Sequence, residues 1–120
     1  MQWKFTGDKP VYQQIMEHLR CAVLTGGYQP GARIEPVREL AMMANVNPNT
    51  MQRALSELER EGILVGCGTL GRFVTSDEDI LNAARRATRI EAARSCAAKL
   101  QAFGLTLEEA AALLKEEETP

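Results

Sequence analysis

Four polar side chains in the middle of the chain have the types and the spacing to recognise another molecule by hydrogen bonding. They offer two amides, a hydroxyl and a guanidinium, and they are Asn49, Thr50, Gln52 and Arg53. Such groups, carried near the N-terminus of a short helix, match the donors and acceptors at base edges in the DNA major groove. The alternative interpretation is the solvated face of an ordinary amphipathic helix.

A helix that begins at Pro48 would position these side chains. Proline is well tolerated in the first turn of a helix, and Asn47 before it can cap the helix N-terminus. Gly62 is expected to end this helix. The residues at positions i, i+3, i+4 and i+7 are apolar and predict a buried stripe opposite the polar face: Met51, Ala54, Leu55 and Leu58.

Two further helices are expected before the central one. Pro10 opens a helix that ends at Gly26 and Gly27, and its apolar stripe contains Tyr12, Ile15, Leu19, Ala22 and Val23. After a Pro-Gly turn and a brief strand at 33–34, a second helix is expected over 37–44, with Arg38 in its first turn. Residues 45–47 then lead into the central helix, which is the helix-turn-helix arrangement.

The periodicity changes after Gly62. Residues 63–65 and 73–75 have the composition of strands, and the glycine-rich segment 66–71 lies between them. We therefore expect a β-hairpin behind the helix-turn-helix, which makes a winged helix. The segment also matches G-x-G-x-x-G, but a dinucleotide site requires a helix directly afterwards, and a strand is expected here instead.

The remaining residues predict two helices. Residues 76–79 can cap a long helix to about Phe103, and Thr106 with Glu109 forms a capping box for the last one. Apolar residues expected to face inward on the long helix are Ile80, Ala83, Ala84, Ala87, Ile90, Ala97 and Leu100. The fold class is thus mostly α with a small β-hairpin: a winged helix-turn-helix over 1–75 and a two-helix dimerisation tail over 76–120.

Charge and composition limit the function. The 120 residues have a net charge of −2, but residues 1–75 hold eight Lys and Arg against seven Asp and Glu, whereas 76–120 hold six against nine. Neither an apolar leader nor a metal-ligand spacing among the three cysteines is evident. We expect a cytoplasmic protein with no cofactor, no bound metal, no catalytic residues and no membrane partner. One histidine leaves little for an enzyme to use.

The runs VREL, VNPNTMQRAL and ELEREGIL, followed by a glycine hairpin ending in GRFV, resemble the GntR family of bacterial transcription regulators. The short two-helix tail is similar to that of the YtrA subfamily. The resemblance implies a homodimeric repressor, joined through its C-terminal helices, on a palindromic operator of double-stranded DNA, in some relatives that of a transporter operon. It implies DNA contacts by Arg38, Asn47, Asn49, Thr50, Gln52, Arg53, Gly68, Thr69 and Arg72.

This chain departs from the family pattern in two places. It has Ile34, Glu35 and Pro36 where Leu-Pro-Ser is the commonest form, and Arg72 is the wing's one basic residue. The rival interpretation is a winged helix that binds a protein partner and has little DNA affinity. The operator, the regulated genes and the existence of a small-molecule effector stay open at this stage.

Overall fold

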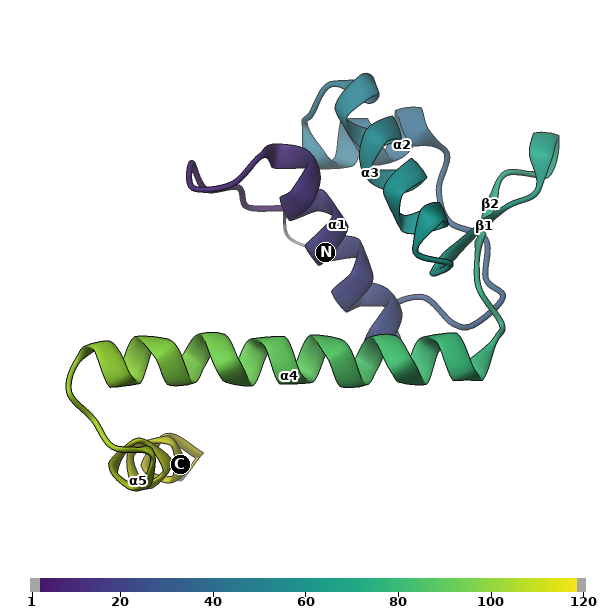
Figure 1. Cartoon of the computed structure of the whole chain (residues 1–120). Helices are drawn as coiled ribbons and strands as arrows, with labels where there is room; N and C mark the ends of the chain where they lie inside the picture. Colours follow the sequence, from purple (N-terminus) through teal and green to yellow (C-terminus); the bar gives the residue numbers. More distant parts are fainter. Residues whose placement is uncertain (1–2, 119–120) are drawn as a thin grey trace. The chain divides into compact units, whose positions relative to one another are not determined.

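A computed structural model describes residues 3–118 as helices joined by short turns, with one two-stranded sheet (Figure 1). The chain divides into two compact units, the first ending at Asn82 and the second beginning at Ala83. The expected fold class, mostly helical with one antiparallel hairpin, is confirmed. In order, the elements are α1 (Val11–Leu24), α2 (Val37–Ala44), α3 (Pro48–Arg60), β1 (Leu64–Gly66), β2 (Arg72–Val74), α4 (Glu78–Ala102) and α5 (Leu107–Glu118).

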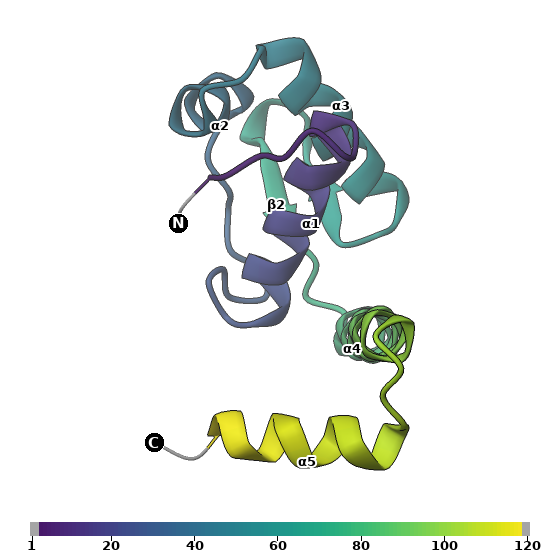
Figure 2. The ribbon, with the colours of Figure 1, turned by 90° about the vertical axis from the view of Figure 1, so that its left-hand side faces the viewer.

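Helix α3 is the centre of the first unit, where it packs against α1 and α2 (Figures 1 and 2). The predicted stripe on α3 is confirmed, because all four of its apolar side chains are 0% exposed. The predicted cap is confirmed as well, since Asn47 Oδ1 accepts the Asn49 N–H at 2.7 Å. The buried side chains of the other two helices are Ile15, Leu19 and Val23 on α1 and Leu40, Ala41 and Ala44 on α2.

The turn between α2 and α3 depends on Asn45. This residue adopts the left-handed conformation, with φ 54° and ψ 51°, which asparagine tolerates better than most residues. The following residue, Val46, then donates its N–H to the Ala41 carbonyl at 3.0 Å, which closes the end of α2. A three-residue connection of this kind turns the chain from α2 into α3 and completes the helix-turn-helix.

The hairpin forms with antiparallel pairing, and Val65 lies opposite Phe73. Its strands begin and end one residue away from the expected positions at 63–65 and 73–75. At the first strand, the Ile63 N–H donates to the Leu58 carbonyl at 3.1 Å and so completes the end of α3. We call residues 64–74 the wing; between its strands, Gly68–Leu70 form a single 3-10 turn.

The first turn of α4 belongs to the first unit, which therefore extends past the expected boundary at residue 75. Asp77 Oδ1 accepts the Asp79 N–H at 3.0 Å and starts the helix. Leu81 is 1% exposed, although the apolar pattern placed Ile80 and not Leu81 on the inward face. Ile80 lies beside Gly62 instead, where an added Cβ would be 3.6 Å from its Cδ1.

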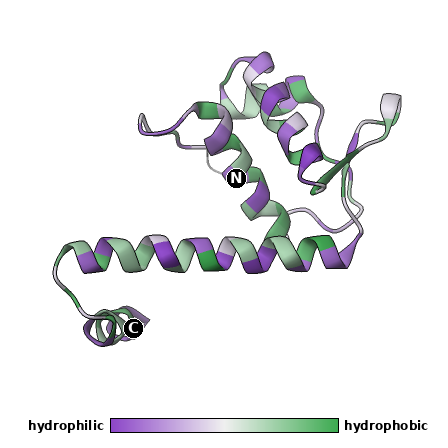
Figure 3. Ribbon diagram, in the orientation of Figure 1, coloured by the Kyte–Doolittle hydropathy of each residue, from purple (hydrophilic) through white to green (hydrophobic). Residues whose placement is uncertain are grey.

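The second unit consists of the rest of α4 and of α5. The expected capping box is present, because the Thr106 N–H donates to Glu109 Oε1 and the Glu109 N–H to Thr106 Oγ1, both at 3.1 Å. Of the residues expected to face inward, Ala83, Ala87 and Ile90 are exposed in the single chain. Hydrophilic and hydrophobic residues are interspersed along α4 (Figure 3). No helix within residues 3–118 is long and apolar enough to cross a membrane.

Candidate nucleic-acid interface

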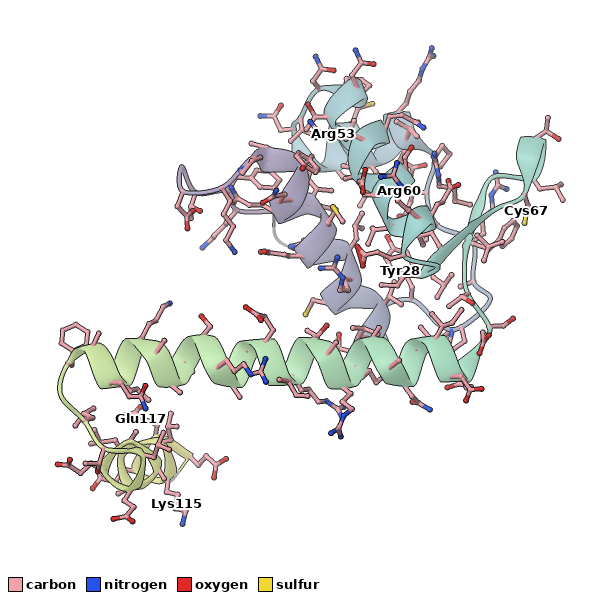
Figure 4. All side chains as sticks on the ribbon, viewed as in Figure 1. Tyr28, Arg53, Arg60, Cys67, Lys115 and Glu117 are labelled. Carbon is pink, nitrogen blue, oxygen red and sulfur yellow. The ribbon has the colours of Figure 1, made fainter. Side chains whose placement is uncertain are left out.

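The polar residues at the start of α3 share its exposed face. Asn49, Gln52 and Arg53 are exposed and Thr50 is half-buried, so that all four are opposite the buried stripe. Figure 4 shows Arg53 extending from α3. The Gln52 amide donates to Ser56 Oγ at 3.3 Å, a contact between two exposed side chains that another acceptor can replace. The structure therefore brings the predicted base-reading groups together on one surface.

Two other expected contact residues are exposed as well. Arg38 is exposed in the first turn of α2. Asn47 is exposed as well, but its side-chain oxygen is occupied by the cap of α3. The amide nitrogen of Asn47 remains a donor, because only the oxygen takes part in capping.

Tyr12 is a residue of this region that the sequence pattern assigned to the core of α1. Its ring is half-buried and lies under the guanidinium of Arg53, at 3.8 Å from the guanidinium carbon to the ring centroid. The spacing of Tyr12 fits the apolar stripe of α1, so nothing in the sequence indicated a contact with a polar residue 41 positions further on.

The wing presents its tip to solvent. Gly68 and Thr69 are exposed there, and so is Cys67 (Figure 4). Arg72 is different, because its side chain is 18% exposed and its Nε donates to the carboxylate of Glu59 on α3. The DNA contact by Arg72 that the family resemblance implies would require this ion pair to open.

Ion pairs divide the basic residues of the first unit into two groups. Four of them contact a carboxylate: Lys9, Arg20, Arg60 and Arg72. Among the pairs of the first three, the Arg20–Glu61 ion pair is the shortest, at 2.6 Å. Within residues 3–118, no carboxylate pairs with the other four basic residues of this unit, which are Lys4, Arg33, Arg38 and Arg53. Two of these, Arg38 and Arg53, were expected to bind DNA from the sequence.

Glu35 is an acidic residue close to the start of α2. The hydroxyl of Tyr28 donates to Glu35 Oε2 at 2.5 Å. Burial, and secondarily this bond to Glu35, raise the pKa of Tyr28 well above its ordinary value, so the hydroxyl stays protonated and continues to donate. The bond fixes the Glu35 carboxylate against the turn at residue 28.

Residues 11–74 match the family described as bacterial regulatory proteins, gntR family. The uncharacterized HTH-type transcriptional regulator YhcF of Bacillus subtilis is 32% identical over 109 residues, which cover 91% of this chain and 90% of that protein. The HTH-type transcriptional repressor YtrA of Bacillus subtilis is 38% identical over 68 residues, but the match covers 57% of this chain and 52% of YtrA.

Solved structures of similar fold include regulators of the same family. A GntR family transcriptional regulator from Listeria monocytogenes has a TM-score of 0.86 and 29% identity, and the match covers 93% of this chain and 98% of that one. AraR(DBD), solved in complex with operator ORX1, has a TM-score of 0.58 and 25% identity over 62% of this chain and 96% of its own. The match to the family model and the YhcF alignment both extend over more than half of the sequence, and YtrA is among the relatives, so this chain belongs to the gntR family of bacterial regulatory proteins and is YtrA-like.

Proposed function

We propose that two copies of this chain bind a palindromic operator in bacterial DNA and repress transcription there, in the cytoplasm where the chromosome lies. The observation that carries the proposal is the exposed polar face of α3, opposite a fully buried stripe on the same helix. Membership of a family of DNA-binding regulators supports the DNA partner. The relative YtrA is named a repressor, which supports repression over activation.

Base recognition falls to α3 in this proposal. Asn49, Gln52 and Arg53 are exposed in its first two turns and contact base edges, while Thr50 contacts a base or the adjoining phosphate. Asn47 and Arg38 contact the strand that passes the start of the helix. The exposed backbone of Gly68 and the hydroxyl of Thr69 follow the DNA backbone from the tip of the wing.

The second unit holds the two copies together. Half of the exposed large apolar residues of the described chain are in this unit, and they are Ile90, Phe103, Leu107, Leu113 and Leu114. Among the residues of this unit that the structure describes, 83–118, Ala110 is the one within the buried core, so this part of the unit has little interior of its own. A second copy would cover these side chains, and the hydrophobic effect would stabilise the pair by removing them from water.

Selection of bound sequences from a random duplex pool, with the full-length protein, tests the proposal. We expect an enriched palindrome whose half-sites are separated by one or more helical turns, each about 34 Å, because each copy presents one α3 to the major groove. Gln52→Ala, which removes one base-reading amide from the exposed face, should give a different or weaker consensus from the same pool. A folded wild-type protein that enriched no sequence would contradict the proposal.

The rival function, a winged helix that binds a protein, is favoured by one observation. The single basic residue of the wing, Arg72, is already neutralised by Glu59. If the selection experiment enriched no sequence, binding of a protein partner through the exposed face of α3 would become the preferred function.

A further inference from the structure

A groove of about 500 Å³ lies between the wing, the segment before α2 and the C-terminal half of α3. Four charged side chains line it, two of each sign: Arg33, Arg72, Glu35 and Glu59. Their formal charges cancel, so the groove attracts an anion only if the contacts among these groups leave one cation exposed.

The backbone of Arg33 is fixed to the wing. Arg33 pairs with Phe73 in an isolated antiparallel bridge on the side of β2 that β1 leaves open. The bridge is flanked by two hydrogen bonds, from the Ile34 N–H to the Arg72 carbonyl at 3.0 Å and from the Val74 N–H to the Ala32 carbonyl at 2.8 Å. Because strand pairing holds this segment, the position of Arg33 is determined by the sheet.

The Arg33 side chain lies across Gly71, at the start of β2. A Cβ added at Gly71 would lie 3.2 Å from Arg33 Nε, and Gly71 has a φ of +99°, which a residue with a side chain rarely adopts. The absence of a side chain at 71 therefore gives the guanidinium its place beside the wing. Arg33 is exposed and forms no ion pair within the described residues 3–118.

Both carboxylates of the groove are held by other residues. Glu59 binds Arg72 and lies against Gly66, where an added Cβ would be 3.0 Å from Glu59 Oε2. Glu35 accepts the hydroxyl of Tyr28. These contacts leave Arg33 as the cation of the groove that no carboxylate contacts.

We propose that Arg33 binds a phosphodiester group of the DNA strand that runs beside the wing, and that Arg72 is a positioning residue that fixes the wing to α3 through Glu59. The inference rests on the proposed DNA-binding function and deepens it, because it assigns the backbone contact to a residue before α2. It replaces the DNA contact by Arg72 that the family resemblance implies. A guanidinium binds phosphate with paired N–H groups, which an arginine already bound to a carboxylate cannot offer.

The dependence of affinity on salt distinguishes the two roles. Binding of the full-length protein to its selected duplex is measured by fluorescence anisotropy across a range of KCl concentrations. The slope of log K against log [KCl] is negative, and each lost phosphate contact makes it shallower by about 0.9. We expect Arg33→Gln to make the slope shallower by about that amount per copy bound, and to weaken binding to selected and random duplexes by the same factor. Arg33→Lys keeps the charge and should keep the slope.

Arg72→Gln should leave the salt slope unchanged while it weakens binding, because it loosens the wing without removing a phosphate contact. Glu59→Gln should also leave the slope unchanged. Arg60→Gln is the matched control, since Arg60 is on the same helix as Glu59 and its side chain is 77% exposed. It should change neither affinity nor slope. Circular dichroism of each variant establishes that it is folded.

An unchanged slope for Arg33→Gln would overturn the role of Arg33. A shallower slope for Arg72→Gln, or a steeper one for Glu59→Gln, would make Arg72 the phosphate contact and overturn the assignment. If the wild-type protein bound no duplex at all, the proposed function would fall first and this inference with it. That outcome is distinct from wild-type binding that does not depend on Arg33.

Discussion

The guanidinium of Arg53 on α3 stacks over the ring of Tyr12 on α1, with 3.8 Å between the guanidinium carbon and the ring centre. The contact joins the helix proposed to read bases to the helix that packs behind it. Cation–π contacts at exposed sites are worth about 0.5–1 kcal/mol. This contact also restricts a long side chain to few conformations before DNA arrives, so that less conformational entropy is lost on binding.

Tyr12→Leu should therefore weaken operator binding, whereas Tyr12→Phe, which keeps the aromatic face, should bind like the wild type. The measurement is the dissociation constant for the selected duplex at fixed salt concentration. Arg53→Ala should cost about 1–3 kcal/mol and relax sequence preference at one position. In the Arg53→Ala background Tyr12→Leu should have no further effect, because the ring acts through the guanidinium. Additive effects of the two substitutions would contradict this coupling.

The local features of α3 could be predicted from the sequence because each depends on neighbouring residues. The cap at Asn47, the stop at Gly62 and the buried stripe all follow from spacing along one helix, and all are found. The exposure of the polar face follows from the same periodicity. The capping box of Thr106 and Glu109 was predictable for the same reason, as both partners lie within one turn.

The cap of α3 should make a measurable contribution to the stability of the protein. Asn47→Ala should lower the free energy of unfolding by about 1 kcal/mol, because the Asn49 N–H loses its acceptor at the helix start. Urea unfolding followed by circular dichroism measures the change. Asn47→Ser is the control, since serine also caps and should retain most of the stability. Equal losses for alanine and serine would show that the cap contributes nothing.

Contacts between distant segments could not be predicted. The Arg72–Glu59 pair requires the hairpin to return the chain to α3, and the stacking of Arg53 on Tyr12 requires α1 to cross α3 at a particular position. In each contact, the number of residues between the two partners follows from no helix or strand period. The phase of α4 was also misjudged, because Ile80 and Leu81 are both apolar and only the packing of the first unit decides which is buried.

The apolar surface of the second unit leads to a prediction about assembly. Full-length protein should elute as a dimer in size-exclusion chromatography with light scattering, at concentrations of tens of micromolar. Ile90→Glu should shift it toward monomer, because Ile90 is 38% exposed on α4 and a carboxylate in an apolar interface is costly. Met42→Glu, at an exposed position of α2 in the first unit, should leave the dimer intact. A wild-type monomer would contradict the proposed assembly.

The only histidine and the only tryptophan in the sequence form a pair that we expect to respond to pH. The rings of His18 and Trp3 are stacked with their centroids 4.2 Å apart. Burial lowers the pKa of His18 below its ordinary 6.5, so the folded protein binds the proton less readily than the unfolded chain. Any stability that depends on neutral His18 is complete above about pH 6.5 and falls as the pH is lowered toward the folded pKa.

A titration of Trp3 fluorescence measures this pKa, because a protonated imidazole against the indole changes its emission. We expect a midpoint below 6.5 in the folded protein. His18→Gln should remove the transition and leave the emission nearly constant across the same range. A midpoint at or above 6.5 would mean that burial does not control the ionisation of His18.

The pairing of four cations in the first unit with carboxylates also affects how the protein would search a chromosome. Attraction to arbitrary DNA grows with the number of phosphates neutralised, and Lys9, Arg20, Arg60 and Arg72 are already occupied. We therefore expect the chain to bind unrelated sequence weakly and to leave it quickly. Its occupancy of a promoter would then follow its cellular concentration closely, and a few base-pair changes in that promoter would be enough to abolish control.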